Sequence, residues 1–337
     1  SEELATMPLP EPLASSDPRH LPGGTGLTTD PGHVRRGVGY GVTLKNLAFS
    51  EAFDDYSDAR IVLSPIGVEV YTAAAEVGQG LVTIIQQLVR DVLKMEQVAV
   101  VWADTGVIGS AGSTSASRQT QMSGGAAYFC AVELRDQILR EFGGDDLSAE
   151  GVWQDGELTV TLDEVCALEP REHEIRYRHP ETFATDENGQ GDAHPAYAVA
   201  AHRAVVDVDP ELGLVRVIQV DAVHDVGKLL NPVAAYGQIE GGTMQGIGMA
   251  ILEELVLEKG VIKNPNFTDY LLPTFLDAPD VKVRWVEEPE RWGPLGAKGI
   301  GEPPTISAGP AVAAAIRDAI GRHLYRVPIL PQHIVGL

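Results

Sequence analysis

Cysteine and basic residues are scarce in this sequence, and each shortage excludes a class of protein. The two cysteines, Cys130 and Cys166, are too few for an iron–sulfur cluster or a zinc site within the chain, so both are predicted to be free thiols. Lys and Arg total 25 against 48 Asp and Glu, which gives a net charge of −23. Nucleic-acid binding needs a basic surface, so this composition argues against it.

Long apolar runs are also missing. No window approaches the roughly 20 apolar residues of a membrane span. The first residues show no basic and apolar leader of the secretory type. We therefore expect a cytoplasmic protein without a membrane partner.

Length and composition predict more than one folded unit. A chain of 337 residues corresponds to two or three domains at about 150 residues each, and its hydrophobic content of 44% is ample for cores. Residues 1–35 are rich in Pro, Gly, Asp and Ser and are predicted to form an extended arm or linker. Two α+β subdomains are expected to follow, over 36–195 and 196–337, with mixed sheets and packed helices.

Periodicity and turn signals indicate where strands and helices lie. Pro65 to Gly67 predicts a hairpin within 59–75, and Pro210 to Gly213 predicts a second one. Residues 170–195 are charged and are predicted to form a solvated loop. Its three histidines lack metal-ligand spacing, so we assign no metal ligand to a protein side chain. Other expected elements are strands 37–44, 98–103 (buried), 158–162, 197–209, 214–223 and 281–287, and helices 81–93, 119–142, 233–256 and 306–320.

Residues 76–80 (EVGQG) lead directly into the predicted helix 81–93. Gly78 and Gly80 allow the Gln79 amide and neighbouring N–H groups to approach a ligand. A helix N-terminus also favours negative charge. A simple strand-to-helix turn explains this string equally well.

Residues 109–125 (GSAGSTSASRQTQMSGG) combine hydroxyls, small residues and Arg118 ahead of a long helix. Free N–H groups, hydroxyls and a guanidinium at a helix start suit a phosphate or pyrophosphate. The string predicts an anion-binding loop, and a flexible Ser/Gly loop is the alternative.

Several glycines interrupt the predicted helix 233–256, each at a cost of about 1 kcal/mol relative to Ala. Close packing of a cofactor or of another helix against these positions explains that cost. Gln238 is the polar side chain on this helix that we select as a cofactor contact.

Residues 294–304 (PLGAKGIGEPP) hold one carboxylate at the stiff end of a glycine-rich loop. The prolines after Glu302 fix the backbone there. The alanine-rich run 306–320 is predicted to be a buried helix, so Glu302 is expected to be partly desolvated and suited to general base catalysis. A surface turn with a solvated Glu is the simpler alternative.

Five strings resemble one family in the same order: EVGQG, GSTSASR, GQIEGG, N-F-x-D-Y-x-L-P and AKGIGEPP. They resemble the second half of the molybdenum-cofactor-binding subunit of molybdenum hydroxylases of the xanthine dehydrogenase type. The likeness covers nearly the whole chain from about Arg36. It implies two molybdopterin-binding subdomains, with the metal held by the dithiolene of the pterin.

The resemblance implies a site as well as a fold. Glu302 is the catalytic base in a hydroxylation that takes oxygen from water and oxidises a purine- or nicotinate-like N-heterocycle or an aldehyde. The string at 45–50 (KNLAFS) favours N-heterocycles. The implied cofactor is molybdopterin with Mo, in its cytosine dinucleotide form. The implied cofactor contacts are Gly78, Gln79, Gly80, Ser115, Ala116, Ser117, Arg118, Gln119, Gln238 and Gly299.

The strings typical of the family's first half, including a G-G-G-F-G-x-K loop, are missing from this sequence. The expected partners are therefore a chain or segment that carries this first half, an iron–sulfur subunit with [2Fe–2S] clusters and an FAD subunit, besides the small-molecule substrate. Two other functions remain open: a non-catalytic structural or cofactor-insertion subunit, and an ordinary dinucleotide-binding module. The second lacks a G-x-G-x-x-G after a strand.

Overall fold

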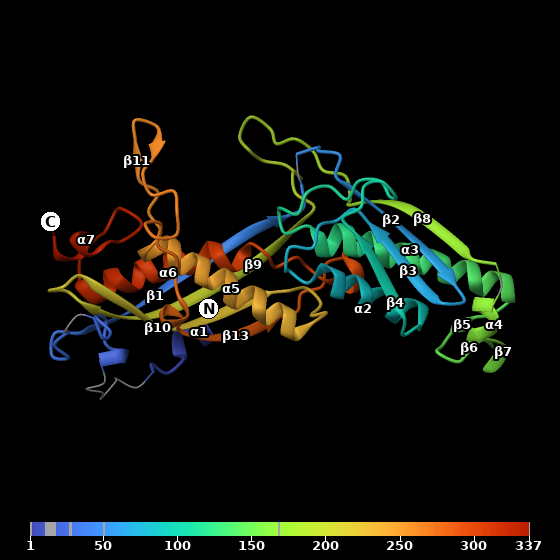
Figure 1. Ribbon diagram of the computed structural model, residues 1–337, viewed down its shortest axis with the longest axis horizontal. Helices are drawn as coiled ribbons and strands as arrows, with labels where there is room; N and C mark the ends of the chain where they lie inside the picture. Colours follow the sequence, from blue (N-terminus) through green and yellow to red (C-terminus); the bar gives the residue numbers. More distant parts are fainter. Residues whose placement is uncertain (1, 11–17, 27–28, 50, 168, 337) are drawn as a thin grey trace.

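The computed structural model describes residues 2–10, 18–26, 29–49, 51–167 and 169–336. Two lobes lie end to end, and each is a four-stranded sheet with two helices on one face (Figure 1). The elements are α1 (Glu2–Thr6), η1 (Pro18–His20), β1 (Arg35–Leu47), β2 (Tyr56–Ser64), β3 (Gly67–Thr72), α2 (Leu81–Leu93), β4 (Val98–Trp102), α3 (Gln119–Phe142), β5 (Asp146–Leu147), β6 (Gly151–Gln154), β7 (Glu157–Thr161), α4 (Leu162–Ala167), β8 (Arg171–Arg178), β9 (Ala196–Asp209), β10 (Leu214–Asp225), α5 (Pro232–Ile251), β11 (Leu257–Glu258), β12 (Val261–Ile262), η2 (Phe275–Asp277), β13 (Asp280–Val286), η3 (Pro294–Gly296), α6 (Pro303–Ile320) and α7 (Pro331–Val335).

The first lobe contains the sheet β4-β3-β2-β8, with α2 and α3 packed against it. The predicted hairpin is confirmed as the antiparallel pair β2 and β3, and α2 and α3 have the predicted bounds. The prediction of a loop over 170–195 is wrong for its first part, which forms β8 against β2. The prediction of a buried strand at 98–103 is also wrong, because β4 is an edge strand and Trp102 is 44% exposed.

The second lobe contains the sheet β1-β9-β10-β13, covered by α5 and α6. The predicted hairpin of β9 and β10 is confirmed. The subdomain boundary is corrected, because β1 pairs with β9 along its whole length from Arg35 to Leu47. The first strand, β1, thus belongs to the sheet of the second lobe. The chain then forms the first lobe and returns to the second lobe at β9, so 36–195 is not one unit.

A row of glycines lets α6 lie close to β1. Gly37, Gly39 and Gly41 share the face of β1 that points toward the helix, since successive residues of a strand alternate between faces. A Cβ atom on Gly39 would come within 2.2 Å of the Ala311 carbonyl oxygen of α6. The alanine-rich surface predicted for 306–320 is buried here, with Ala311 and Ala315 fully covered.

The described part of residues 1–35 lies against the second lobe. Arg203 of β9 donates a hydrogen bond to the Met7 carbonyl oxygen, and Arg36 of β1 donates one to Pro10. Beneath this arm, Arg203 and Asp221 form an ion pair at 2.8 Å in which both side chains are 2% exposed. The predicted arm also includes 11–17 and 27–28, which lie outside the described residues.

Two histidines are buried between the second sheet and its helices. The ring of His202 is hydrogen-bonded to Ser307 of α6 and to Thr243 of α5, at 2.8 and 3.1 Å. Neither ring nitrogen of His224 has a hydrogen-bond partner among the described residues. Burial lowers the pKa of His202 to about 4. Burial, with a smaller effect from His202, lowers the pKa of His224 to about 3.

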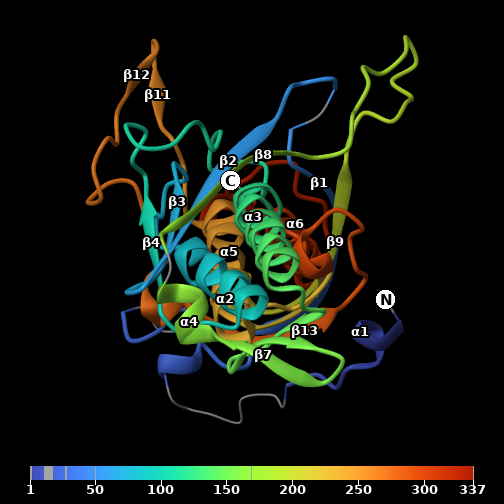
Figure 2. The ribbon, with the colours of Figure 1, turned by 90° about the vertical axis from the view of Figure 1, so that its right-hand side faces the viewer.

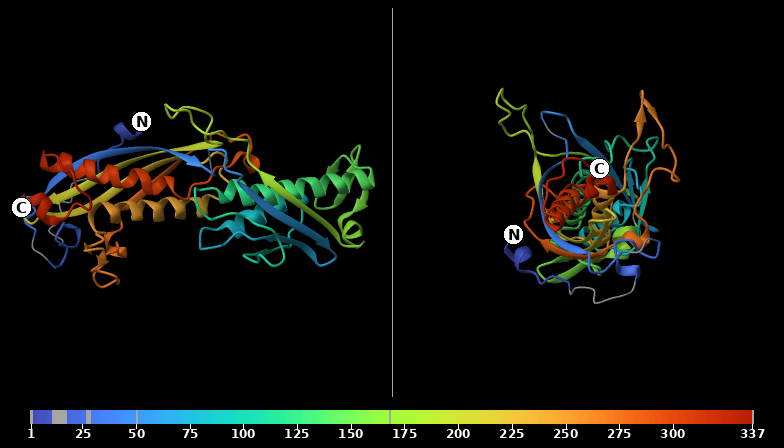
Figure 3. Two further views of the ribbon diagram at one scale, coloured as in Figure 1. Left: turned by 90° about the horizontal axis from the view of Figure 1, so that it is seen from above. Right: turned by 90° about the vertical axis from the view of Figure 1, so that its left-hand side faces the viewer.

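The four longest helices lie at the centre of the molecule, with strands of both sheets around them (Figure 2). Seen from above, the helix pair α2 and α3 and the pair α5 and α6 meet near the middle of the long axis (Figure 3). Within the described ranges, no helix is both long enough and apolar enough to cross a membrane.

The glycine row gives a test of the packing of α6 on β1. Gly39→Ala forces Cβ against the backbone of α6, so the free energy of unfolding should fall by about 1–3 kcal/mol or more. The matched control is Gly237→Ala in α5, where a Cβ atom meets nothing within 4 Å and should add up to about 1 kcal/mol. Urea unfolding measures both variants. Equal effects in the two would contradict this account.

The histidine pair predicts acid sensitivity. Because both folded-state pKa values lie below 6.5, the unfolded chain binds more protons than the folded chain between about pH 4 and 6.5. Stability is therefore complete above this window and falls as pH drops through it, by up to about 1.4 kcal/mol per pH unit for each histidine. Replacement of His224 by Gln, which does not protonate, should reduce the difference in melting temperature between pH 7 and pH 5. If the difference in melting temperature between pH 7 and pH 5 stayed the same in the His224→Gln variant, His224 would not be a source of the acid sensitivity.

Candidate functional site

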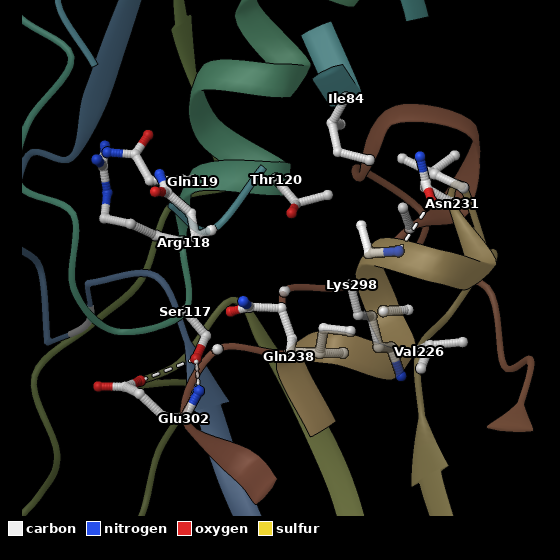
Figure 4. Close-up of a pocket in the computed structure, with 18 of the residues that line it drawn as sticks. Ile84, Ser117, Arg118, Gln119, Thr120, Val226, Asn231, Gln238, Lys298 and Glu302 are labelled. Atoms are coloured by element: carbon white, nitrogen blue, oxygen red, sulfur yellow. Dashed lines mark hydrogen bonds between the residues drawn. The ribbon is translucent and has the colours of Figure 1, made fainter. Parts of the chain in front are cut away.

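A cavity of about 310 Å³ lies where the two lobes meet. Residues at or near the N-termini of α2, α3, α5 and α6 line it, so four helix N-termini adjoin one space (Figure 4). Of the predicted site residues, Gly78, Gly80 and Ala116 do not line the cavity. The structure brings together the other eight: Gln79, Ser115, Ser117, Arg118, Gln119, Gln238, Gly299 and Glu302.

The cavity has the electrostatic character of an anion site. Helix α3 begins at Gln119 without a side-chain cap, so the N–H groups of its first turn are free to bind a ligand. Helix α5 differs, because Asn231 caps it by accepting a hydrogen bond from the Ala234 N–H at 2.9 Å. Lys228 and Lys298 also line the cavity, but each is paired with a carboxylate of the chain: Lys228 with Glu287 at 3.2 Å and Lys298 with Asp225 at 2.6 Å. The chemistry favoured here is a phosphate or another oxyanion.

Arg118 does not have its predicted role. Its side chain is fully buried and pairs with Asp55 through two hydrogen bonds, at 2.9 and 2.6 Å. Its other N–H groups donate to the carbonyl oxygens of Ala111, Ser113 and Tyr56. All five donors of the guanidinium are therefore used within the protein. Arg118 shapes the loop and does not offer a hydrogen bond to a phosphate.

The Gln119 side chain is likewise used inside the loop. Its Nε2 donates to the Ser113 carbonyl oxygen and to the Thr114 hydroxyl, at 3.2 and 3.1 Å, and its Oε1 accepts from Ser123. The Ser115 hydroxyl is exposed and bonded only to Ser113. The predicted anion-binding loop can thus offer hydroxyls and backbone N–H groups of α3, but not the Arg118 guanidinium or the Gln119 amide.

The start of α2 is already occupied by a carboxylate of the chain itself. Glu76 accepts hydrogen bonds from the N–H groups of Gly78, Gly80 and Val82, at 2.8 to 3.0 Å. Partial burial opposes ionisation of Glu76, but these hydrogen bonds outweigh it and hold its pKa below the usual value. The Gln79 amide is bonded within the same turn, to Ala75 and Val77. The prediction that N–H groups here approach an anionic ligand is therefore wrong for this turn.

Glu302 is held by the opposite lobe. The Glu302 N–H donates to the Ser117 Oγ at 3.0 Å, and that hydroxyl donates to the Glu302 Oε2 at 2.9 Å. Ser117 has a left-handed backbone with φ of 48°. Gly299 packs on it so closely that a Cβ atom would lie 1.6 Å from the Ser117 carbonyl oxygen. Only glycine fits at position 299. Gly299 therefore lies at the site because it packs on the Ser117 backbone.

The prediction that Glu302 is desolvated is wrong for this chain. Its side chain is 44% exposed, and its Oε2 forms an ion pair at 3.2 Å with Lys45 of β1. Its carboxylate lies on the opposite side of Ser117 from Gln238, at the edge of the cavity (Figure 4). The reason is tertiary: α6 is buried as predicted, but the turn before it faces outward.

Gln238 is the predicted residue with a free amide. It lines the cavity and makes no hydrogen bond to any residue that the structure describes.

Three lysines at or near the site, Lys45, Lys228 and Lys298, were not predicted as site residues from the sequence. The Nζ of Lys298 pairs with Asp225 at 2.6 Å within the wall. Lys45 and Lys298 belong to strings noted from the sequence, whereas no local signal identified Lys228. Ser50, the last residue of the string at 45–50, lies outside the described residues.

The donor set of the cavity suits an organic anion better than a bare metal ion. Among the described residues, no group of three or more His, Cys, Asp or Glu is placed to hold a metal. Hydroxyls, a free amide, helix N–H groups and lysines are instead the partners of phosphate and of heterocyclic edges. A phosphorylated pterin that carries its own metal fits these residues.

Comparison with known proteins agrees with this chemistry. Residues 26–279 match the family model described as molybdopterin cofactor-binding domain. The gamma subunit of the 6-hydroxypseudooxynicotine dehydrogenase complex of Paenarthrobacter nicotinovorans is 32% identical over 316 residues, which cover 88% of this chain and 39% of that protein. The putative xanthine dehydrogenase molybdenum-binding subunit XdhA of Escherichia coli K12 is 28% identical over 335 residues, with 91% and 43% covered.

A solved structure gives the same result. Quinoline 2-oxidoreductase of Pseudomonas putida 86 superimposes with a TM-score of 0.77 at 27% identity, over 90% of this chain and 42% of that one. The chain therefore belongs to the molybdopterin cofactor-binding family of molybdenum hydroxylases, as its five strings predicted. The predicted α+β fold is also confirmed. The chain spans about two-fifths of the length of these relatives.

The buried ion pair of Arg118 generates a test. Arg118→Met leaves the Asp55 carboxylate buried and unpaired, so the protein should lose about 3–5 kcal/mol of folding stability, besides any loss of cofactor. The matched control is Arg178→Met, which breaks the neighbouring pair with Asp54, where the side chains are 47% and 66% exposed. It should cost at most about 1 kcal/mol. Chemical unfolding of cofactor-free protein measures both. Native stability in Arg118→Met would restore the phosphate-binding interpretation.

Proposed function

We propose that this chain is the molybdopterin-binding subunit of a multi-subunit hydroxylase, with Glu302 as the general base. The observation that carries the proposal is the position of Glu302 at the edge of the inter-lobe cavity, fixed through Ser117. A carboxylate in a rigid loop beside an anion-binding cavity can accept a proton from a reactant bound next to the cofactor. The oxygen added to the substrate comes from water.

The cofactor binds in the inter-lobe cavity. The first turn of α3 and the Ser115 hydroxyl bind its phosphates, and the Gln238 amide contacts its polar edge. Gln79 and Gly299 contribute to the wall. The bound molybdenum pterin supplies the two-electron redox chemistry, and the protein contributes binding, orientation and proton transfer. The cytosine dinucleotide form fits the extent of the resemblance at 112–118.

The complete enzyme contains further polypeptide. The relatives are more than twice as long as the part that this chain matches. We infer a partner chain or segment that supplies the remaining molybdopterin-binding region, together with an iron–sulfur subunit and an FAD subunit. Electrons pass to these subunits. Both cysteines are free, which suits a reducing compartment such as the cytoplasm.

An N-heterocycle is the substrate class that we favour. Three of the similar proteins are named for 6-hydroxypseudooxynicotine, xanthine and quinoline, all of which contain a nitrogen heterocycle, while others are named as aldehyde oxidoreductases. The carbon next to a ring nitrogen is electron-poor and open to attack by a water-derived oxygen. Aldehyde oxidation is the other class that the resemblance implies, and a direct comparison of the two substrate types separates them.

Replacement of Glu302 by Gln tests the proposal. The amide keeps the size of the carboxylate but cannot accept the proton. The assembled complex should therefore retain its molybdenum and its nucleotide, while reduction by substrate slows about 100-fold or more. Anaerobic stopped-flow spectroscopy measures the reduction rate, and elemental analysis measures molybdenum.

The control variant is Glu157→Gln, at an exposed position of β7 far along the first lobe. It should match the unmodified complex in both measurements. Normal reduction in Glu302→Gln would mean that Glu302 is not the base. A complex that holds molybdenum but oxidises neither substrate class would instead point to a subunit that inserts or carries the cofactor.

A further inference from the structure

Lys45 lies near the end of β1, and its side chain is only 17% exposed. Its Nζ donates hydrogen bonds to the Asn46 carbonyl oxygen at 2.5 Å and to the Asn46 Oδ1 at 3.1 Å, and it forms an ion pair with the Glu302 Oε2 at 3.2 Å. Two of the three ammonium protons are therefore used by Asn46. The Lys45 ammonium is thus held by Asn46, and its charge lies beside the Glu302 carboxylate.

The two oxygens of the Glu302 carboxylate have different surroundings. Oε2 receives the Ser117 hydroxyl and lies beside the Lys45 ammonium. Oε1 has no hydrogen-bond donor among the described residues. A carboxylate whose two oxygens were equally free could rotate between equivalent positions. Two contacts on one oxygen remove that freedom and leave the other oxygen as the open acceptor.

The contacts on Oε2 come from one connected unit. Ala48, three residues after Lys45, donates its N–H to the Ala116 carbonyl oxygen at 3.0 Å, next to Ser117 in the chain. Asn46 fixes the lysine through two acceptors. The end of β1 and the loop that carries Ser117 are thus joined by backbone hydrogen bonding, and Glu302 lies between them.

We propose that Lys45 is a positioning residue for Glu302: together with Ser117 it fixes Oε2 and leaves Oε1 as the oxygen that accepts the proton. The inference rests on the proposed function of Glu302 as general base and adds a residue to it. Lys45 touches neither substrate nor cofactor in this account. It acts through the orientation of the carboxylate, since its ion pair holds the Glu302 Oε2 in place.

Steady-state kinetics of the assembled complex tests this role. Lys45→Met keeps the length of the stem but removes the cation, so kcat should fall about tenfold to hundredfold while KM changes less than about twofold. Lys45→Arg keeps the charge and should recover part of the loss. The control is Lys94→Met at the end of α2, which breaks a pair with Asp91 far from the cavity and should leave both constants unchanged. Lys45→Gln replaces Lys45→Met if the latter folds poorly.

A double variant separates this inference from the function on which it rests. In the Glu302→Gln background, Lys45→Met should cause no further loss of kcat, because the carboxylate that it positions is gone. The cofactor-free protein gives a second readout: the two single changes should lower the melting temperature by amounts that sum to more than the effect of the double change.

Three results would overturn the proposal. A rise in KM with kcat unchanged would make Lys45 a substrate contact. Independent melting-temperature effects of the two changes would remove the ion pair as an interaction in solution. Normal kcat in Lys45→Met, while Glu302→Gln is inactive, would reject the positioning role and leave the general base intact. Full activity in Glu302→Gln would instead reject the proposed function itself.

Discussion

The buried ion pair of Asp55 and Arg118 is the interaction on which the site depends. Both side chains are almost fully covered, and the five hydrogen bonds of the guanidinium go to Asp55, to the Tyr56 carbonyl oxygen and to the loop carbonyl oxygens of Ala111 and Ser113. Removal of either partner would leave a buried charge unpaired, which is among the most costly changes a protein can suffer. The pair therefore fixes the loop in the conformation that presents Ser117, and through Ser117 it fixes Glu302.

The second constraint is close backbone packing between the lobes. Gly299 lies on the Ser117 backbone, and the glycines of β1 allow α6 to approach that strand. Because β1 pairs with β9 in the second lobe yet ends beside the loop of the first, one strand joins both halves of the site. The Glu302 carboxylate, Ser117 and Lys45 are thus supplied by three segments that are distant in sequence.

The net charge of −23 does not by itself favour an anion, so the proposed phosphate contacts depend on local features of the cavity. The feature of the cavity that suits an anion is backbone, at the uncapped start of α3, because the lysines at 228 and 298 are each paired with a carboxylate. The start of α2 carries Glu76, which satisfies its own helix. Local geometry, and not overall charge, therefore determines which helix end can bind a phosphate.

Local sequence signals were enough to predict many of the helices and strands and to identify the family. Apolar periodicity defined α2 and α3, turn residues defined both hairpins, and short strings identified the molybdopterin-binding class, because all of these signals are local. Which side chains and strands pair with each other became visible only in the folded chain. Arg118 pairs with Asp55 across 63 residues, β1 joins the second sheet, and Lys45 reaches Glu302. The pairing of a charged side chain depends on which residues the fold brings close to it, and a local pattern along the chain does not contain that information.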